Sequence, residues 1–254
     1  MFLSRISRKK WGDVMFLRVL GSGSSGNCYL LESADEVLVV EAGVPFADVK
    51  EAIDYQTSKI VGVLSSHEHG DHRKYLHEYE SYLIDCMKGN QIVKYSCAFS
   101  YIDNSFMFGK FRVYCFEVPH DVPCFGYQIE HPDMGKLIFV TDAEYCKYTF
   151  QEVNHIMVEA NYAQDILDEN MNSGDIPKKL RDRIMKTHSS IETAKGIVKS
   201  NKNPMLRNVV LLHLSGHNSD GDRFRKEVKD IAGDYCNVTV ARKGVTVDLD
   251  LCPF

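Results

Sequence analysis

The sequence predicts an α/β protein of four layers, in which two β-sheets pack face to face and helices cover both outer faces. The first observation is that short apolar segments typical of strands recur in two groups, and that helical patterns follow each group. The second is size: a chain of 254 residues, 44% hydrophobic and 26% charged, can bury the core of one domain. Each group of strands can form a sheet, and each sheet needs a covering layer for its outer face.

The individual elements follow from local patterns. Strands are expected at residues 16–20, 28–32, 36–41, 60–64, 91–97, 111–117, 124–130, 136–141, 155–159 and 208–213. Helices are expected at residues 45–55, 73–88, 162–170, 177–186 and 220–232. A capping box of Ser189 and Glu192 should start a further helix that reaches Asn201. Near the end, residues 238–240 and 245–247 should form a hairpin that turns at Lys243 and Gly244.

Regular patterning begins at Met15, which sets the expected domain organisation. Residues 15–254 should form a single domain, and residues 1–14 a basic N-terminal extension outside its core. The N-terminus has no apolar run of signal-peptide length, and no later segment is long enough to span a bilayer. Eight cysteines without a C-x-x-C pair indicate free thiols. A cytoplasmic protein without a membrane partner is therefore expected.

The overall charge restricts the binding partners. With a net charge of −5 the chain has no global cationic field, so contact with nucleic acid would need a local basic patch. Residues 178–183 contain four basic side chains and are either a solvated helix face or the rim of a substrate site. The sequence identifies no substrate-binding residue.

A dense group of histidines follows the apolar strand at 60–64. The segment from His67 to His72 contains three histidines and an aspartate within six residues. In an extended segment residues two apart face the same way, so His67 and His69 can bind one metal ion while the turn after them directs Asp71 and His72 to a second. A structural role does not explain such density, and a metal centre is predicted.

On these residues the sequence resembles the metallo-β-lactamase superfamily, whose signature is H-x-H-x-D-H after a buried strand. The glycine- and serine-rich segment at 21–28 is similar to the YycJ/WalJ-like branch, which is related to the RNase Z and phosphodiesterase members. Residues 140–142, 159–162, 188–189 and 213–215 carry the same likeness. The resemblance spans residues 15–249 and implies the αββα metallo-β-lactamase sandwich, with two mixed sheets and helices on both outer faces.

The resemblance also implies the site residues. His67, His69 and His120 would hold one metal ion. Asp71, His72 and His213 would hold the other, with Asp142 between the two ions. His188 would protonate the leaving group, oriented by Glu159, and Asp71 is included among the catalytic residues. His77, His131, His155 and His217 match no motif and are expected at the surface.

Two departures from the family pattern bear on the site. Glu41 stands where the family usually has aspartate, so an outer role near the metal would use a side chain longer by one methylene. Arg73 and Lys74 replace a segment in which many members keep a glycine, and they could place two cations beside an anionic substrate.

Five imidazoles and two carboxylates, with no cysteine, suit Zn²⁺, with Mn²⁺ as the alternative. Two divalent ions, two carboxylates and a bridging hydroxide leave a formal charge of about +1, which favours an anionic substrate. The expected enzyme is a phosphodiester hydrolase in which that hydroxide attacks phosphorus.

Two substrates and one inactive role stay open at this stage, because the fold does not choose the chemistry. A nuclease acting on DNA or RNA is the first hypothesis, and a phosphodiesterase of cyclic or other small nucleotides is the second. A groove lined by several Lys and Arg would favour the polymer, whereas a closed pocket with an aromatic shelf, supplied by the second subunit of a homodimer, would favour nucleotides. A catalytically silent binding module is the third, and it would be favoured if His120 or Asp142 lay outside the site.

Overall fold

A computed structural model describes residues 15–93, 100–102 and 105–251. The expected extension at residues 1–14 lies outside the described residues, as does part of the strand expected at 91–97. The division into an extension and a single domain at 15–254 therefore stays a prediction.

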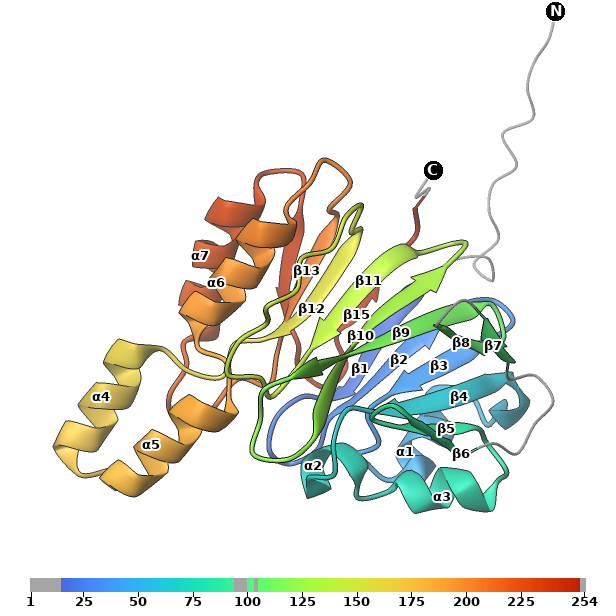
Figure 1. The fold of residues 1–254 in the computed structure, drawn as a ribbon, viewed down its shortest axis with the longest axis horizontal. Helices are drawn as coiled ribbons and strands as arrows, with labels where there is room; N and C mark the ends of the chain where they lie inside the picture. Colours follow the sequence, from blue (N-terminus) through green and yellow to red (C-terminus); the bar gives the residue numbers. More distant parts are fainter. Residues whose placement is uncertain (1–14, 94–99, 103–104, 252–254) are drawn as a thin grey trace, which may run out of the picture.

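The first sheet has seven strands in the order β15-β1-β2-β3-β4-β5-β6 (Figure 1). Its strands are β1 (Phe16–Gly21), β2 (Cys28–Glu32), β3 (Val37–Val40), β4 (Ile60–Ser65), β5 (Cys86–Lys88), β6 (Gln91–Val93) and β15 (Thr246–Asp248). The pairs β3–β4 and β4–β5 are parallel and the other pairs are antiparallel, so the sheet is mixed.

The second sheet has eight strands in the order β14-β13-β12-β11-β10-β9-β8-β7. Its strands are β7 (Ser100–Ile102), β8 (Ser105–Phe108), β9 (Phe111–Val118), β10 (Cys124–His131), β11 (Gly135–Val140), β12 (His155–Glu159), β13 (Asn208–Leu212) and β14 (Asn237–Val240). From β11 to β14 neighbouring strands are parallel, so their carboxyl ends meet at one edge.

Helices form the two outer layers (Figure 1). They are α1 (Phe46–Ala52), α2 (Gly70–Arg73), α3 (Leu76–Ser81), α4 (Gln164–Ser173), α5 (Lys178–Thr187), α6 (Ile191–Asn201) and α7 (Gly221–Ala232). α1 and α3 pack on the first sheet, and α6 and α7 on the second. Within the described chain, no helix combines the length and the apolar character needed to cross a membrane.

Three apolar clusters correspond to the three interfaces between the four layers. Leu17, Tyr29, Tyr127 and Phe139 belong to the cluster between the two sheets. The strands β12 and β13 are buried at every position, because the sheets pack on one face and α6 and α7 on the other. The predicted four-layer α/β fold is confirmed.

Some local predictions were wrong. The expected hairpin does not form: β14 pairs with β13 of the second sheet, and β15 pairs with β1 of the first, so the chain crosses between sheets at the predicted turn. The helix expected at 73–88 divides into α2 and α3 and then enters β5. Ser190, rather than Ser189, caps α6 by accepting a hydrogen bond from the Thr193 amide. His131 and His155 are buried, not at the surface.

Candidate metal centre

The predicted site residues lie where strands of both sheets end. β4 leads into the segment of His67 to His72, and β9 leads into His120. Asp142 and His213 follow the parallel strands β11 and β13, and Glu159 is the last residue of β12 between them. Because parallel strands in register end together, three distant parts of the chain place side chains at one edge.

The backbone is unusual at three of these positions. Glu41, Asp142 and His213 follow β3, β11 and β13 and have left-handed φ values of 68°, 47° and 52°. Such a conformation costs a non-glycine residue on the order of 1–3 kcal/mol and is concentrated at functional sites. The fold therefore tolerates strain at the point where these side chains turn toward the site.

One group of possible metal ligands consists of His67, His69 and His120, whose donor atoms lie within 4.8 Å of one another. His69 Nδ1 is 3.2 Å from His120 Nε2. Nδ1 of His67 is 2.9 Å from Ser66 Oγ, while its buried Nε2 has no hydrogen-bond partner among the described residues. Burial, with nearby His72, lowers the pKa of His67 to about 2, so this imidazole is neutral and able to bind a cation.

A second group consists of Asp71, His72 and His213. His213 Nε2 lies 3.1 Å from Asp71 Oδ2. Asp142 connects the two groups, because its Oδ2 lies 2.5 Å from His72 Nε2 and 3.6 Å from His67 Nε2. Burial opposes protonation of His72, but the charges of Asp142 and Glu41 raise its pKa well above the usual value.

Glu41 reaches the site despite the family's usual aspartate. Its carboxylate accepts a hydrogen bond of 3.2 Å from the Ser66 amide, and its Oε2 lies 3.5 Å from His72 Nδ1. This nitrogen is the one that faces away from Asp142 and Asp71. Glu41 thus lies behind the imidazole ring as a charged neighbour, where outer residues of metal sites are commonly found, without a hydrogen bond to it.

His188 lies beside the second group rather than in it. Its Nδ1 donates a 2.7 Å hydrogen bond to Glu159 Oε1 and lies 2.9 Å from Asp142 Oδ1. The same oxygen of Glu159 is 3.0 Å from His213 Nδ1. Burial opposes protonation of His188, but Glu159 and Asp142 outweigh it and raise the pKa to about 10. His188 and Glu159, which the resemblance pairs, are thus joined by a hydrogen bond.

Sequence reasoning missed two polar residues at this edge. Asp121 Oδ1 lies 3.3 Å from His69 Nε2 and 3.1 Å from His120 Nε2. Asn161 donates a 2.8 Å hydrogen bond to the carbonyl of His213 and so fixes its strained turn. Asp121 directly follows His120 and Asn161 lies two residues after Glu159, and that adjacency was the available signal.

A cavity of about 560 Å³ opens over the site. Its walls include His69, Asp71, His120, Asp142, His188 and His213. One face of α5 contributes Leu180, Arg183, Ile184 and Thr187. Arg73 and Lys74 are not among the residues that line it, so the two cations expected from the departure at α2 do not face the substrate space. The segment at 178–183 instead supplies Arg183.

The donor set fits divalent metal ions. Imidazole nitrogens and carboxylate oxygens converge in overlapping groups within 4.8 Å, with the Nε2 of His67 buried and lacking a hydrogen-bond partner in the described chain. A buried donor of this kind is costly unless something binds it. No thiol belongs to these groups among the described residues.

Comparison with known proteins gives concordant results. A family model described as the metallo-β-lactamase superfamily matches residues 21–74. Exodeoxyribonuclease YycJ of Bacillus anthracis is 26% identical over 236 residues, which are 84% of this chain and 87% of that protein.

Two solved structures share the fold over almost the whole chain. The metallo-β-lactamase fold protein YhfI of Bacillus subtilis superposes with a TM-score of 0.66 at 20% identity, covering 93% of this chain and 99% of that one. The short form of human tRNase Z has a TM-score of 0.54 at 15% identity and covers 92% and 99%. The predicted resemblance is confirmed: the chain is a metallo-β-lactamase-fold protein, similar to YycJ and to RNase Z structures.

Proposed function

We propose that this protein is a two-metal hydrolase that cleaves phosphodiester bonds in DNA or RNA. The observation that carries the proposal is the convergence of the seven predicted ligands, five histidines and two aspartates, in overlapping groups beside one cavity, which five of the seven line. The relatives named as an exodeoxyribonuclease and a tRNase support a nucleic-acid substrate.

In the proposed centre, His67, His69 and His120 would hold one ion and Asp71, His72 and His213 the other, with Asp142 within reach of both groups. Zn²⁺ suits these donors, with Mn²⁺ as the alternative. When bound, the ions activate water and neutralise the charge of a phosphate group.

The chain's own residues would supply the proton for the leaving group and orient the metal ligands. Glu159 and Asp142 engage Nδ1 of His188, which leaves Nε2 as the nitrogen that can meet a substrate in the cavity. Two carboxylates beside one imidazole favour its protonated form. His188 therefore donates a proton to the leaving oxygen, a contribution of about 10² to 10⁴-fold for a well-positioned acid. Asn161 keeps His213 in place by a hydrogen bond, and the carboxylate of Glu41 lies behind the ring of His72.

The two alternatives are less well supported. The described lining of the cavity contains no Phe, Tyr or Trp, and its one cation is Arg183 rather than the several that would favour a polymer. The preference for a polynucleotide therefore rests on the relatives. A silent binding module would be favoured by His120 or Asp142 lying outside the site, yet both line the cavity. A cytoplasmic location and a homodimer remain predictions.

The test is an activity panel with added Zn²⁺ or Mn²⁺ on linear DNA, RNA and cyclic mononucleotides. We expect hydrolysis of a polynucleotide by the wild type and none by Asp71→Ala, while Asp234→Ala, an exposed control, retains the wild-type rate. Metal content and thermal unfolding of each variant separate loss of the site from loss of the fold. Hydrolysis of cyclic mononucleotides alone would overturn the proposal of a nuclease. A wild type that neither binds metal nor hydrolyses any substrate would overturn the proposal of an enzyme.

A further inference from the structure

The helix α5 presents a stripe of side chains to the cavity that is exposed at Leu180 and Arg183 and buried only at Thr187. Leu180, Arg183, Ile184 and Thr187 are spaced three and four residues apart, so they lie on one side of the helix, and all four line the cavity. In a helix that packs on a core, such a stripe would be covered. Here Leu180 is 41% exposed and Arg183 is exposed as well.

Arg183 differs from Arg181, the other arginine of α5, in its lack of a charged partner. Arg181 pairs with Asp168 at 2.9 Å and with Asp182 at 3.2 Å. The guanidinium of Arg183 makes no hydrogen bond or ion pair with any described residue. A planar group with five donors therefore borders the cavity without a partner in the described chain.

Contacts at both ends of the helix orient this group. The Arg181–Asp168 pair ties α5 to α4, and Figure 1 shows the two helices as a hairpin that projects from the body of the sandwich. At its other end α5 stops at Thr187, and His188 follows directly, bound by Glu159. Arg183 thus precedes the proposed proton donor by about 7 Å along the helix axis.

We propose that Arg183 binds a second phosphate of the substrate, next to the scissile one. Leu180 and Ile184 then contact the nucleoside that links these two phosphates. This inference rests on the proposed function and names its substrate class: a chain of at least two phosphates. Guanidinium groups match phosphate oxygens in a two-point contact. A volume of about 560 Å³ also leaves room for more than a scissile phosphate.

The experiment compares Arg183→Gln with Lys186→Gln, which removes an exposed cation from the same helix at a position that does not line the cavity. The substrates are thymidine dinucleotide with a 5′-phosphate, with a 3′-phosphate and with neither, and bis(p-nitrophenyl) phosphate. We expect Arg183→Gln to lower kcat/KM at least about tenfold for one phosphorylated dinucleotide, the loss typical of a charge-assisted contact. Hydrolysis of bis(p-nitrophenyl) phosphate should stay within twofold, and Lys186→Gln should match the wild type throughout.

Binding measured calorimetrically in the presence of a chelator, where no hydrolysis occurs, provides an independent readout. The wild type should prefer one phosphorylated dinucleotide over the unphosphorylated one, and Arg183→Gln should lose that preference. Equal losses on all substrates, or no loss on any, would overturn the assignment. If the wild type cleaves nothing but shows the preference, the proposed function fails and the phosphate subsite stands.

Discussion

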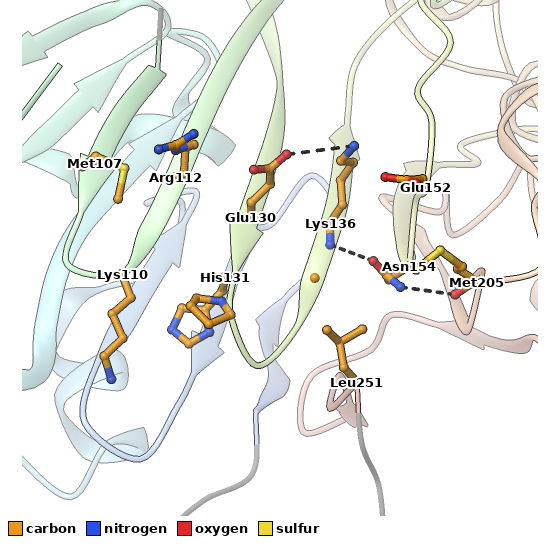
Figure 2. A pocket seen from close by; sticks show the side chains of 12 residues that line it. Met107, Lys110, Arg112, Glu130, His131, Lys136, Glu152, Asn154, Met205 and Leu251 are labelled. Carbon is orange, nitrogen blue, oxygen red and sulfur yellow. Dashed lines mark hydrogen bonds and ion pairs between the residues drawn. The ribbon is translucent and has the colours of Figure 1, made fainter. Parts of the chain in front are cut away.

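The cavity over the candidate metal centre and the groove in Figure 2 have nearly equal volumes, about 560 and 570 Å³. They lie at opposite ends of the second sheet. The groove is bounded by the start of β9, the β10–β11 turn and the residues before β12, whereas the cavity follows the other ends of these strands. The groove and the cavity each contain histidine, carboxylate and cationic side chains.

The pairing of the polar groups distinguishes the two. In the groove, Lys136 Nζ donates to the Gln151 carbonyl at 2.7 Å. The Asn154 side chain accepts from the Lys136 amide at 2.9 Å (Figure 2). His131 lies 3.2 Å from Glu36. At the cavity, His67 Nε2 and Arg183 have no hydrogen-bond partner in the described chain. The cavity is therefore distinguished from the groove by a buried nitrogen and a cation that lack partners in the described chain, and not by its volume.

The largest expected effect contrasts matched acid-to-amide changes at the two ends. Asp142→Asn should lower kcat/KM on the order of 10³-fold, because loss of even an outer partner costs about 10–100-fold and this carboxylate serves both metal positions. Glu130→Gln in the groove is the matched control. Steady-state kinetics and metal analysis of folded protein check the result, and equal losses in both variants would remove the distinction between the two regions.

Metal removal should act on the cavity end alone. A site bound at about 1,000 times its Kd stabilises the folded state by about 4 kcal/mol. For a chain of this size that corresponds to a fall in Tm of about 10 °C on chelation. Calorimetric unfolding with and without chelator measures it, and restoration by Zn²⁺ is the control. An unchanged Tm would indicate that no metal ion bound at these side chains stabilises the folded state.

His155, at the groove end, tests whether a buried histidine there is purely structural. Its Nε2 donates to the Met134 carbonyl at 3.0 Å and its Nδ1 accepts from Asn208 at 3.0 Å, so the neutral ring is fully bonded. Burial lowers its pKa to about 4. The unfolded chain therefore takes up this proton first as pH falls, and stability is lost from about pH 6.5 down to about pH 4.

The size of this effect follows from the two pKa values. The difference between the usual value of 6.5 and about 4 corresponds to about 3 kcal/mol in total, of which about 2 kcal/mol should be lost by pH 5. Urea unfolding of wild type and His155→Gln between pH 7.5 and 5 isolates the contribution as the difference between the two proteins. Parallel curves would show that His155 is not held neutral.

Much of this organisation was accessible from the sequence, because local signals were dense. The apolar strands and the spacing of His67, His69, Asp71 and His72 are short-range patterns, and the resemblance added His120, Asp142 and His213 at long range. The hairpin prediction was wrong because residues 238–240 and 245–247 alternate as strands in either arrangement. The arrangement depends on which strand each segment pairs with, and local sequence does not determine that choice.

The same limit explains the errors around the site. Periodicity alone could not choose between a solvated face and a cavity wall for Arg183, since this depends on where α5 lies. Arg73 and Lys74 follow the ligands in sequence but do not line the cavity. His131 and His155 were expected at the surface because their partners, Glu36 and Asn208, lie 95 and 53 residues away.

The smallest expected effect is that of Glu130→Gln itself, and it tests the groove most directly. Glu130 Oε1 accepts from Gln128 Nε2 at 2.8 Å and lies 4.0 Å from Lys136 Nζ. Glutamine keeps an acceptor and gives up only a long, partly exposed ion pair, so the free energy of unfolding should change by less than about 0.5 kcal/mol. Activity and metal content should not change. A clear loss of polynucleotide binding in this variant would make the groove a second substrate contact and erase the contrast, since Lys136, Asn154 and His131 in the groove already have partners within the protein.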